Sequence, residues 1–110
     1  MAAMSRTRNL YEMMEFPSEG VFSTVVARGD MSNHTLMCLA DGTDITEHTS
    51  TREALVTVLK GKGTFTLRRK KIAMAPGVCI FVPRNAPHAL HADEDLSILL
   101  TLSGKETRRG

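Results

Sequence analysis

The side chains that could coordinate a metal or carry protons near neutral pH are few and scattered. The chain has four histidines and two cysteines. Cys38 and Cys79 lie far apart and form no CxxC pair, so they lack the partners that a thiolate zinc site needs. Both cysteines lie in apolar surroundings, which predicts reduced thiols buried in strands.

Other patterns that carry chemistry are absent or weak. The sequence contains no GxSxG motif, no Gly-rich phosphate loop and no paired carboxylates at helical spacing. Asp41, Asp44 and Glu47 surround a turn at Gly42, but three oxygens on one short loop fall short of a calcium site. The basic run at 68–71 has no interleaved aromatic residues, which predicts a solvated hairpin tip.

Length and charge limit the possible functions. A chain of 110 residues fits one domain, and a formal net charge of +2 is too small to indicate a nucleic-acid or membrane partner. No apolar stretch approaches the ~20 residues that span a bilayer, and the first residues lack a signal-peptide core. We therefore expect a cytoplasmic protein.

The elements that must position any site are mostly strands. We expect a flexible arm at 1–9, one domain at 10–104 and a flexible tail at 105–110. A short helix is predicted over Leu10–Phe16, with Asn9 as its N-cap.

From Val21 onward, short β-branched segments alternate with turn formers. The expected strands are Val21–Ala27, Asn33–Leu39, Ala54–Lys60, Gly63–Leu67, Val78–Val82, Ala89–Ala92 and Leu96–Leu102. No segment after Phe16 sustains a helical period, so the fold class is all-β, either a sandwich or a small barrel.

The spacing of glycines and histidines resembles the first motif of the cupin superfamily. That motif has a Gly, five residues, His-x-His, a Glu three or four residues later and a Gly six residues after that. Here Gly42 leads through five residues to His48, Ser50 replaces the second histidine, and Gly61 closes the motif. Counting back from Gly61 puts the family's glutamate at Ala54.

The second motif also matches in spacing. It runs Gly, five residues, Pro-x-Gly, two residues, His, three residues, Asn. In this chain Gly77 leads to Pro83, Asn85 takes the Gly position, His88 matches the histidine and Ala92 replaces the Asn.

The resemblance covers about residues 20–103 and implies a small RmlC-like cupin. The implied fold is the double-stranded β-helix, a jelly-roll barrel made of two antiparallel sheets. It also implies that His48 and His88, which come from opposite motifs, both point into the barrel.

The departures from the family pattern bear on metal binding. Metal-binding cupins hold an ion such as Mn, Fe, Ni or Zn with three histidines and a glutamate, and only His48 and His88 remain here. Two imidazoles alone bind weakly, so we expect either one such divalent ion or none. Glu53 becomes a third ligand only if a bulge turns it inward, whereas Ser50 could hold a water. His34 and His91 are expected at the surface, with His91 facing away from His88.

Two functions remain open. In the first, the barrel binds a small organic ligand in a pocket formed by His48, Ser50 and His88 and lined by Phe65 and Phe81. In the alternative, implied by the resemblance, a metal-dependent isomerase or dioxygenase acts on a small oxygenated substrate. The apolar stretch Tyr11–Val26 exceeds what one edge strand buries, so we also expect a homodimer, with closure of this segment over its own barrel as the alternative.

Overall fold

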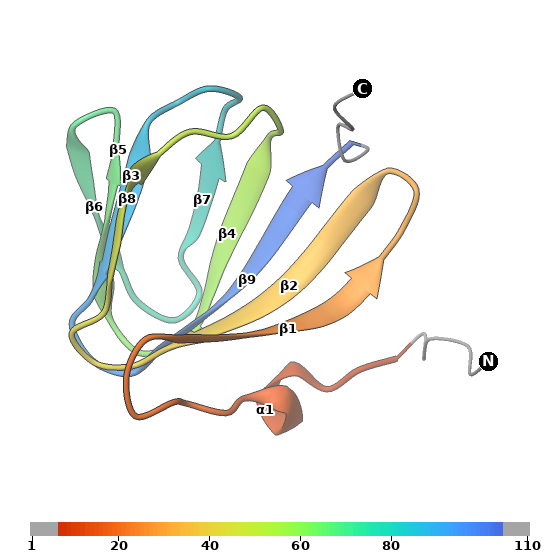
Figure 1. Cartoon of the computed structure of the whole chain (residues 1–110), viewed down its shortest axis with the longest axis vertical. Coiled ribbons are helices and arrows are strands. Elements are labelled where there is room, and N and C mark those ends of the chain that lie inside the picture. Colours follow the sequence, from red (N-terminus) through yellow and green to blue (C-terminus); the bar gives the residue numbers. More distant parts are fainter. Residues whose placement is uncertain (1–6, 105–110) are drawn as a thin grey trace.

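The computed structural model describes residues 7–104, which form a short helix followed by nine strands (Figure 1). Helix α1 spans Leu10–Met13. The strands are β1 (Val21–Arg28), β2 (Ser32–Leu39), β3 (Asp44–His48), β4 (Ala54–Lys60), β5 (Gly63–Leu67), β6 (Lys70–Met74), β7 (Cys79–Val82), β8 (His88–Ala92) and β9 (Leu96–Ser103). None of the helical segments in this part of the chain could span a membrane.

The strands form two antiparallel sheets that face each other (Figure 1). One sheet has the order β1-β2-β9-β4-β7 and the other has the order β3-β8-β5-β6. Alternate side chains of both sheets point into one apolar core. Its buried members are Leu39, Ala54, Val56, Val58, Phe65, Met74, Ile80, Val82, Ala86, Leu90, Ala92, Leu96 and Ile98. This arrangement confirms the predicted all-β jelly-roll barrel.

Two strands were not predicted. Asp44–His48 is mostly exposed, so it gives no apolar alternation that would mark it as a strand. In the basic run only Arg68 and Arg69 form the turn, with positive φ angles of 49° and 73°. Lys70 and Lys71 belong to β6, which pairs with β5. The predicted hairpin tip is therefore confirmed only for its first two residues.

The predicted helix is shorter than expected. Its N-cap is confirmed, because the Asn9 side chain accepts hydrogen bonds from the backbone amides of Tyr11 and Glu12. The helix ends at Met13 rather than Phe16, since Met14 already has extended backbone angles. The predicted tail 105–110 and positions 1–6 of the predicted arm lie outside the described residues.

The segment around α1 covers part of the outer face of the five-stranded sheet. Leu96 and Ile98 point into the core, so Ser97 between them points outward, yet Ser97 is fully buried. Its hydroxyl donates to Met14 Sδ at 3.3 Å. The cross-strand partner of Ser97 is Cys38, which is also buried. In addition to the main core, a smaller buried contact therefore lies between the N-terminal segment and the outer face of the five-stranded sheet.

The two cysteines differ in environment. Both thiols are free, as expected. Cys38 is buried, and this burial raises the pKa of its thiol. Cys79 is exposed, so the prediction that it is buried is wrong. It alternates with the core residue Ile80 on β7, and the outer face at that sheet edge is uncovered.

The turn between β4 and β5 requires glycine. Gly61 has a φ of +90°, which favours glycine over residues with a side chain. A Cβ atom at this position would lie 2.0 Å from the carbonyl oxygen of Asp95. The Gly61 backbone therefore packs directly against the chain that enters β9.

Candidate functional site

The structure brings His48 and His88 together. His48 pairs with His88 across β3 and β8, and their ring centroids lie 4.2 Å apart with an angle of 59° between the ring planes. His88 shares a strand face with the core residue Leu90, two positions later. The pair therefore lies on the barrel side of the four-stranded sheet, where the alignment of the two motifs predicts it.

A β-bulge produces this pairing. Ile45 pairs with Leu90 and His48 pairs with His88, so three steps along β3 match two steps along β8. In a regular ladder Glu47 would lie opposite His88, and His48 would point to the other face. The bulge therefore turns His48 toward His88, where the residue remains exposed.

Each imidazole is fixed by a backbone carbonyl. His48 Nδ1 donates to the carbonyl oxygen of Thr46 at 3.0 Å, and His88 Nδ1 donates to that of Ala86 at 2.8 Å. A carbonyl oxygen can only accept, so Nδ1 carries the proton in both rings. In the neutral form each Nε2 therefore keeps its lone pair for a ligand.

One side of the histidine pair is apolar. The Phe65 and His88 rings stack at an angle of 9° with centroids 5.8 Å apart, and Phe65 is buried. Phe81, in contrast, is 54% exposed and lies between the buried Ile80 and Val82 on β7. Phe81 thus points outward, and the prediction that it lines the barrel pocket is wrong.

Ser50 and Glu53 lie in the loop between β3 and β4. The Ser50 hydroxyl accepts a hydrogen bond from the Arg52 amide, which closes a local turn. Glu53 is exposed and directly precedes Ala54, whose side chain is buried in the core. The bulge lies in β3 rather than before Ala54, so it reorients His48 and not Glu53.

A cupin-type metal centre does not fit the donor set of this chain. At the position that the resemblance assigns to the glutamate, Ala54 is buried among apolar side chains. Within residues 7–104, no three His, Cys, Asp or Glu side chains are grouped so that they could hold a metal ion. The site provides two imidazole nitrogens, which is fewer protein ligands than first-row metal sites use.

The other histidines lie away from the pair. His91 is on the opposite face of β8 and at the surface, as predicted, with Nδ1 2.6 Å from Asp44 Oδ1. His34 is half-buried on β2, where its ring nitrogens contact the hydroxyls of Ser32 and Thr101. His34 is thus less solvated than predicted.

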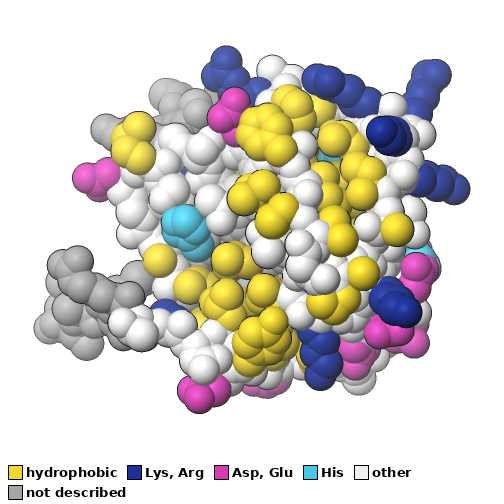
Figure 2. Space-filling view, turned by 180° about the vertical axis from the view of Figure 1, so that it is seen from behind, with side chains coloured by type: hydrophobic (Ala, Val, Ile, Leu, Met, Phe, Trp, Pro, Cys, Tyr) yellow, Lys and Arg dark blue, Asp and Glu magenta, His cyan; other side chains and the backbone are white. Residues whose placement is uncertain are grey.

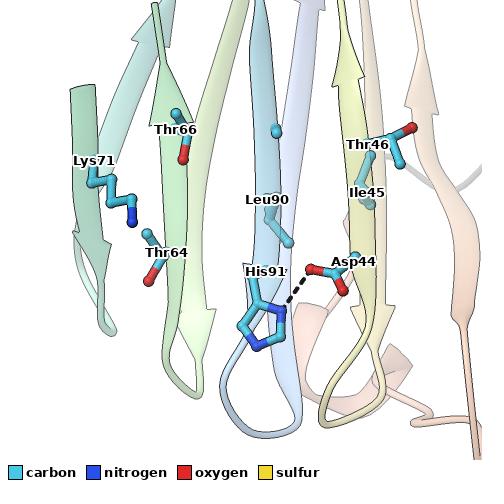
Figure 3. A pocket seen from close by; sticks show the side chains of 9 residues that line it. Asp44, Ile45, Thr46, Thr64, Thr66, Lys71, Leu90 and His91 are labelled. Atoms are coloured by element: carbon cyan, nitrogen blue, oxygen red, sulfur yellow. Dashed lines mark hydrogen bonds and ion pairs between the residues drawn. The ribbon is translucent and has the colours of Figure 1, made fainter. Parts of the chain in front are cut away.

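Beside His91 the structure forms a hollow that sequence reasoning missed (Figure 3). It lies on the outer face of the four-stranded sheet, and polar side chains from all four strands line it. The only sequence signal was alternation, which turns Thr64 and Thr66 away from the buried Phe65 between them.

Comparisons with known proteins match this architecture. A family model described as "Cupin domain" matches residues 35–102. A conserved protein of unknown function from Streptococcus pyogenes is 25% identical, with a TM-score of 0.82 over 96% of this chain and 93% of that one. An RmlC-like cupin protein from Desulfovibrio desulfuricans is 22% identical, with a TM-score of 0.80 over 90% of this chain and 96% of that one.

A cupin 2 conserved barrel domain protein from Leptotrichia buccalis is 30% identical, with a TM-score of 0.81. The match covers 87% of this chain and 47% of that longer protein. No curated protein matches the chain. Since the family model covers more than half of the sequence, the chain belongs to the cupin domain family.

Proposed function

We propose that this protein binds a small organic molecule in its barrel, at His48 and His88. One observation carries the proposal: both Nδ1 atoms donate to backbone carbonyls, which leaves two adjacent Nε2 lone pairs as hydrogen-bond acceptors. Buried Phe65 supplies an apolar wall beside His88. Oriented acceptors beside an apolar wall are typical of small-molecule sites.

This arrangement limits the chemistry of the ligand. In the neutral rings, the two imidazole lone pairs favour a ligand that donates, such as a hydroxyl or N–H group. A carboxylate offers only lone pairs of its own and is disfavoured there. The expected ligand is therefore a small neutral donor with an apolar portion that packs against Phe65.

Three matched probes test the proposal: phenol, anisole and benzoate. They share an aromatic ring, but phenol donates a hydrogen bond, anisole does not and benzoate is an anion. The measurement is the histidine ring signals in NMR spectra as each compound is added. Phenol should produce saturable shifts at His48 and His88, with weaker binding after His48→Ala or His88→Ala and unchanged binding after His34→Ala. Equal binding of anisole, or shifts with none of the three, contradicts the proposal.

The alternative is a metal-dependent isomerase or dioxygenase acting on a small oxygenated substrate. The same Nδ1 hydrogen bonds would orient both Nε2 atoms toward an ion, as they do for metal-bound histidines. Titration of Mn, Fe(II), Ni and Zn into the chelated protein separates the two functions. We expect binding no tighter than roughly millimolar, because only two imidazoles are available. Micromolar binding that either alanine variant removes would favour the enzyme.

The proposal includes a homodimer in a reducing, cytoplasmic setting. Strand β1 is an edge of its sheet, and Val21, Phe22 and Val25 on it are 37–40% exposed. Figure 2 shows hydrophobic side chains gathered across one side of the molecule. Packing of a second copy against β1 would cover such side chains.

The free thiols of Cys38 and Cys79 suit a reducing compartment.

A further inference from the structure

The outer face of the four-stranded sheet has a hollow of about 550 Å³, on the side opposite the histidine pair. Figure 3 shows the side chains that line it. Strand alternation explains its lining. Thr64 and Thr66 flank the buried Phe65, and His91 lies on the opposite face of β8 from His88. Its volume falls within the range of small-molecule sites, roughly 300–1,000 Å³.

The floor of the hollow consists of short side chains. Thr66 pairs with Ala89 on β8 and with Lys71 on β6, and Thr64 pairs with His91. Short residues at the centre and longer ones at the margins leave the open volume. Figure 3 shows Lys71 extending over the sheet toward Thr64.

Several polar groups in the hollow have no partner in the described part of the chain. Among residues 7–104, no hydrogen bond or ion pair engages the Lys71 ammonium or the hydroxyls of Thr64 and Thr66. These groups provide three hydroxyl or ammonium donors on adjacent strands. They are therefore available to an acceptor ligand.

The charges of the hollow are unevenly distributed. At one margin the Asp44 carboxylate holds the His91 ring, with Asp93 3.5 Å from its other nitrogen. The hydrogen bond that His91 donates to Asp44 raises the pKa of His91, and the negative charges of Asp44, Asp93 and Asp41 add to this rise. Lys71, at the other margin, forms no ion pair with any described residue, because the one carboxylate of the lining, Asp44, is engaged by His91. The Lys71 margin therefore attracts an anion.

We propose that this hollow binds a small hydroxylated oxyanion, with its acidic group on Lys71, Thr64 and Thr66. The ligand's hydroxyl groups would extend across Ala89 toward Asp44, whose carboxylate is 68% exposed and can accept from them. A phosphate or a carboxylate could supply the acidic group, because both accept from an ammonium and from hydroxyls. This site is separate from the barrel site and does not depend on it.

The test uses amide NMR shifts of the full chain during titration with glycerol 3-phosphate, glycerate and glycerol. We expect saturable shifts at Thr64, Thr66 and Lys71 at roughly 1–10 mM of at least one anion, and none with neutral glycerol. Saturation by only one of the two anions, glycerol 3-phosphate or glycerate, also supports the proposal and identifies the acidic group that the hollow prefers. Lys71→Gln should weaken binding by roughly tenfold, because a charge-assisted hydrogen bond is lost.

Lys70→Gln is the matched control. It removes the same charge from the next residue, which does not line the hollow, so binding should change less than about twofold. His88→Ala should leave binding unchanged, which separates this site from the barrel site. The proposal is overturned if neither anion saturates or if Lys70→Gln weakens binding as much as Lys71→Gln. That second result would instead indicate a diffuse basic surface at the β5–β6 hairpin.

Discussion

His48 lies directly opposite His88, although a regular strand would place Glu47 there. The extra residue in β3 brings His48 beside His88, and the Thr46 carbonyl accepts a hydrogen bond from its ring, as the Ala86 carbonyl does for His88. The bulge thus sets the position of the imidazole, and the carbonyl two residues earlier sets its tautomer.

The first prediction concerns those tautomers. Nitrogen-15 NMR at a pH above the imidazole pKa should show the Nδ1–H form for His48 and His88, because each Nδ1 faces a carbonyl oxygen. His34 is the internal control, since its two hydroxyl partners can donate or accept and impose neither form. A dominant Nε2–H form of either ring in the pair would contradict the structure.

A second prediction concerns pH. The hydrogen bond to Asp44 raises the pKa of His91 above its value in the unfolded chain. The stabilisation is therefore fully present below about pH 6.5, the unfolded value, and is lost as pH rises through the folded pKa. Asp44→Asn should lower the melting temperature at pH 6 more than at pH 9, and it should lower the pKa of His91 measured by NMR. Asp41→Asn, which removes only a minor charge effect, should change both quantities less.

A third prediction concerns Arg52. Its guanidinium donates to the backbone carbonyls of Ser103 at 2.8 Å, Gly104 at 2.6 Å and Leu102 at 3.5 Å. Arg52→Ala should lower the free energy of unfolding by about 2 kcal/mol, because these half-buried carbonyls lose a charged donor. Denaturant unfolding measures the loss. Arg84 is exposed, so Arg84→Ala should change the free energy of unfolding by less than about 0.5 kcal/mol. Equal losses for the two variants would contradict a specific role for Arg52.

A fourth prediction concerns the segment that covers the five-stranded sheet. A thiol reagent should modify exposed Cys79 quickly and Cys38 slowly, because Cys38 is buried and its pKa is raised. Met14→Ala removes the side chain that contacts Ser97, the cross-strand partner of Cys38, so labelling of Cys38 should accelerate. Mass spectrometry of labelled peptides gives both rates. Fast labelling of Cys38 in the unmodified chain would show that the segment does not protect it.

A fifth prediction concerns assembly. Light scattering at micromolar concentration should give about twice the 12.1 kDa chain mass. Val25→Lys on β1 should shift the population toward single chains, because it places a charge among exposed apolar side chains. Lys60→Gln, on a central strand of the same sheet, should leave the mass unchanged. A 12.1 kDa species for the unmodified chain rules out the dimer.

Much of this fold could be predicted because its signals are local. Turn-forming residues mark the ends of most strands. The spacing of the two motifs predicted that His48 and His88 lie close together, as they do. β3 was missed because it is mostly exposed and is defined by its pairing with β8, so its sequence shows no apolar alternation. Phe81 was misplaced because an apolar residue can lie on an uncovered face, and alternation with Ile80 decides which face that is. The polar hollow depends on cross-strand register, which one sequence does not specify.

The close approach of Gly61 to Asp95 limits which sequences can adopt this barrel. Strand β9 lies between β2 and β4, so its first residues set the alignment of both neighbours. Any side chain at 61 would meet backbone atoms of Asp95 and Leu96, which cannot rotate away as a flexible side chain could. A substitution there would therefore act as a spacer that displaces the start of β9 from both neighbouring strands. Restoring the contact between residue 61 and Asp95 would require the whole strand to shift, because repacking one side chain could not do it.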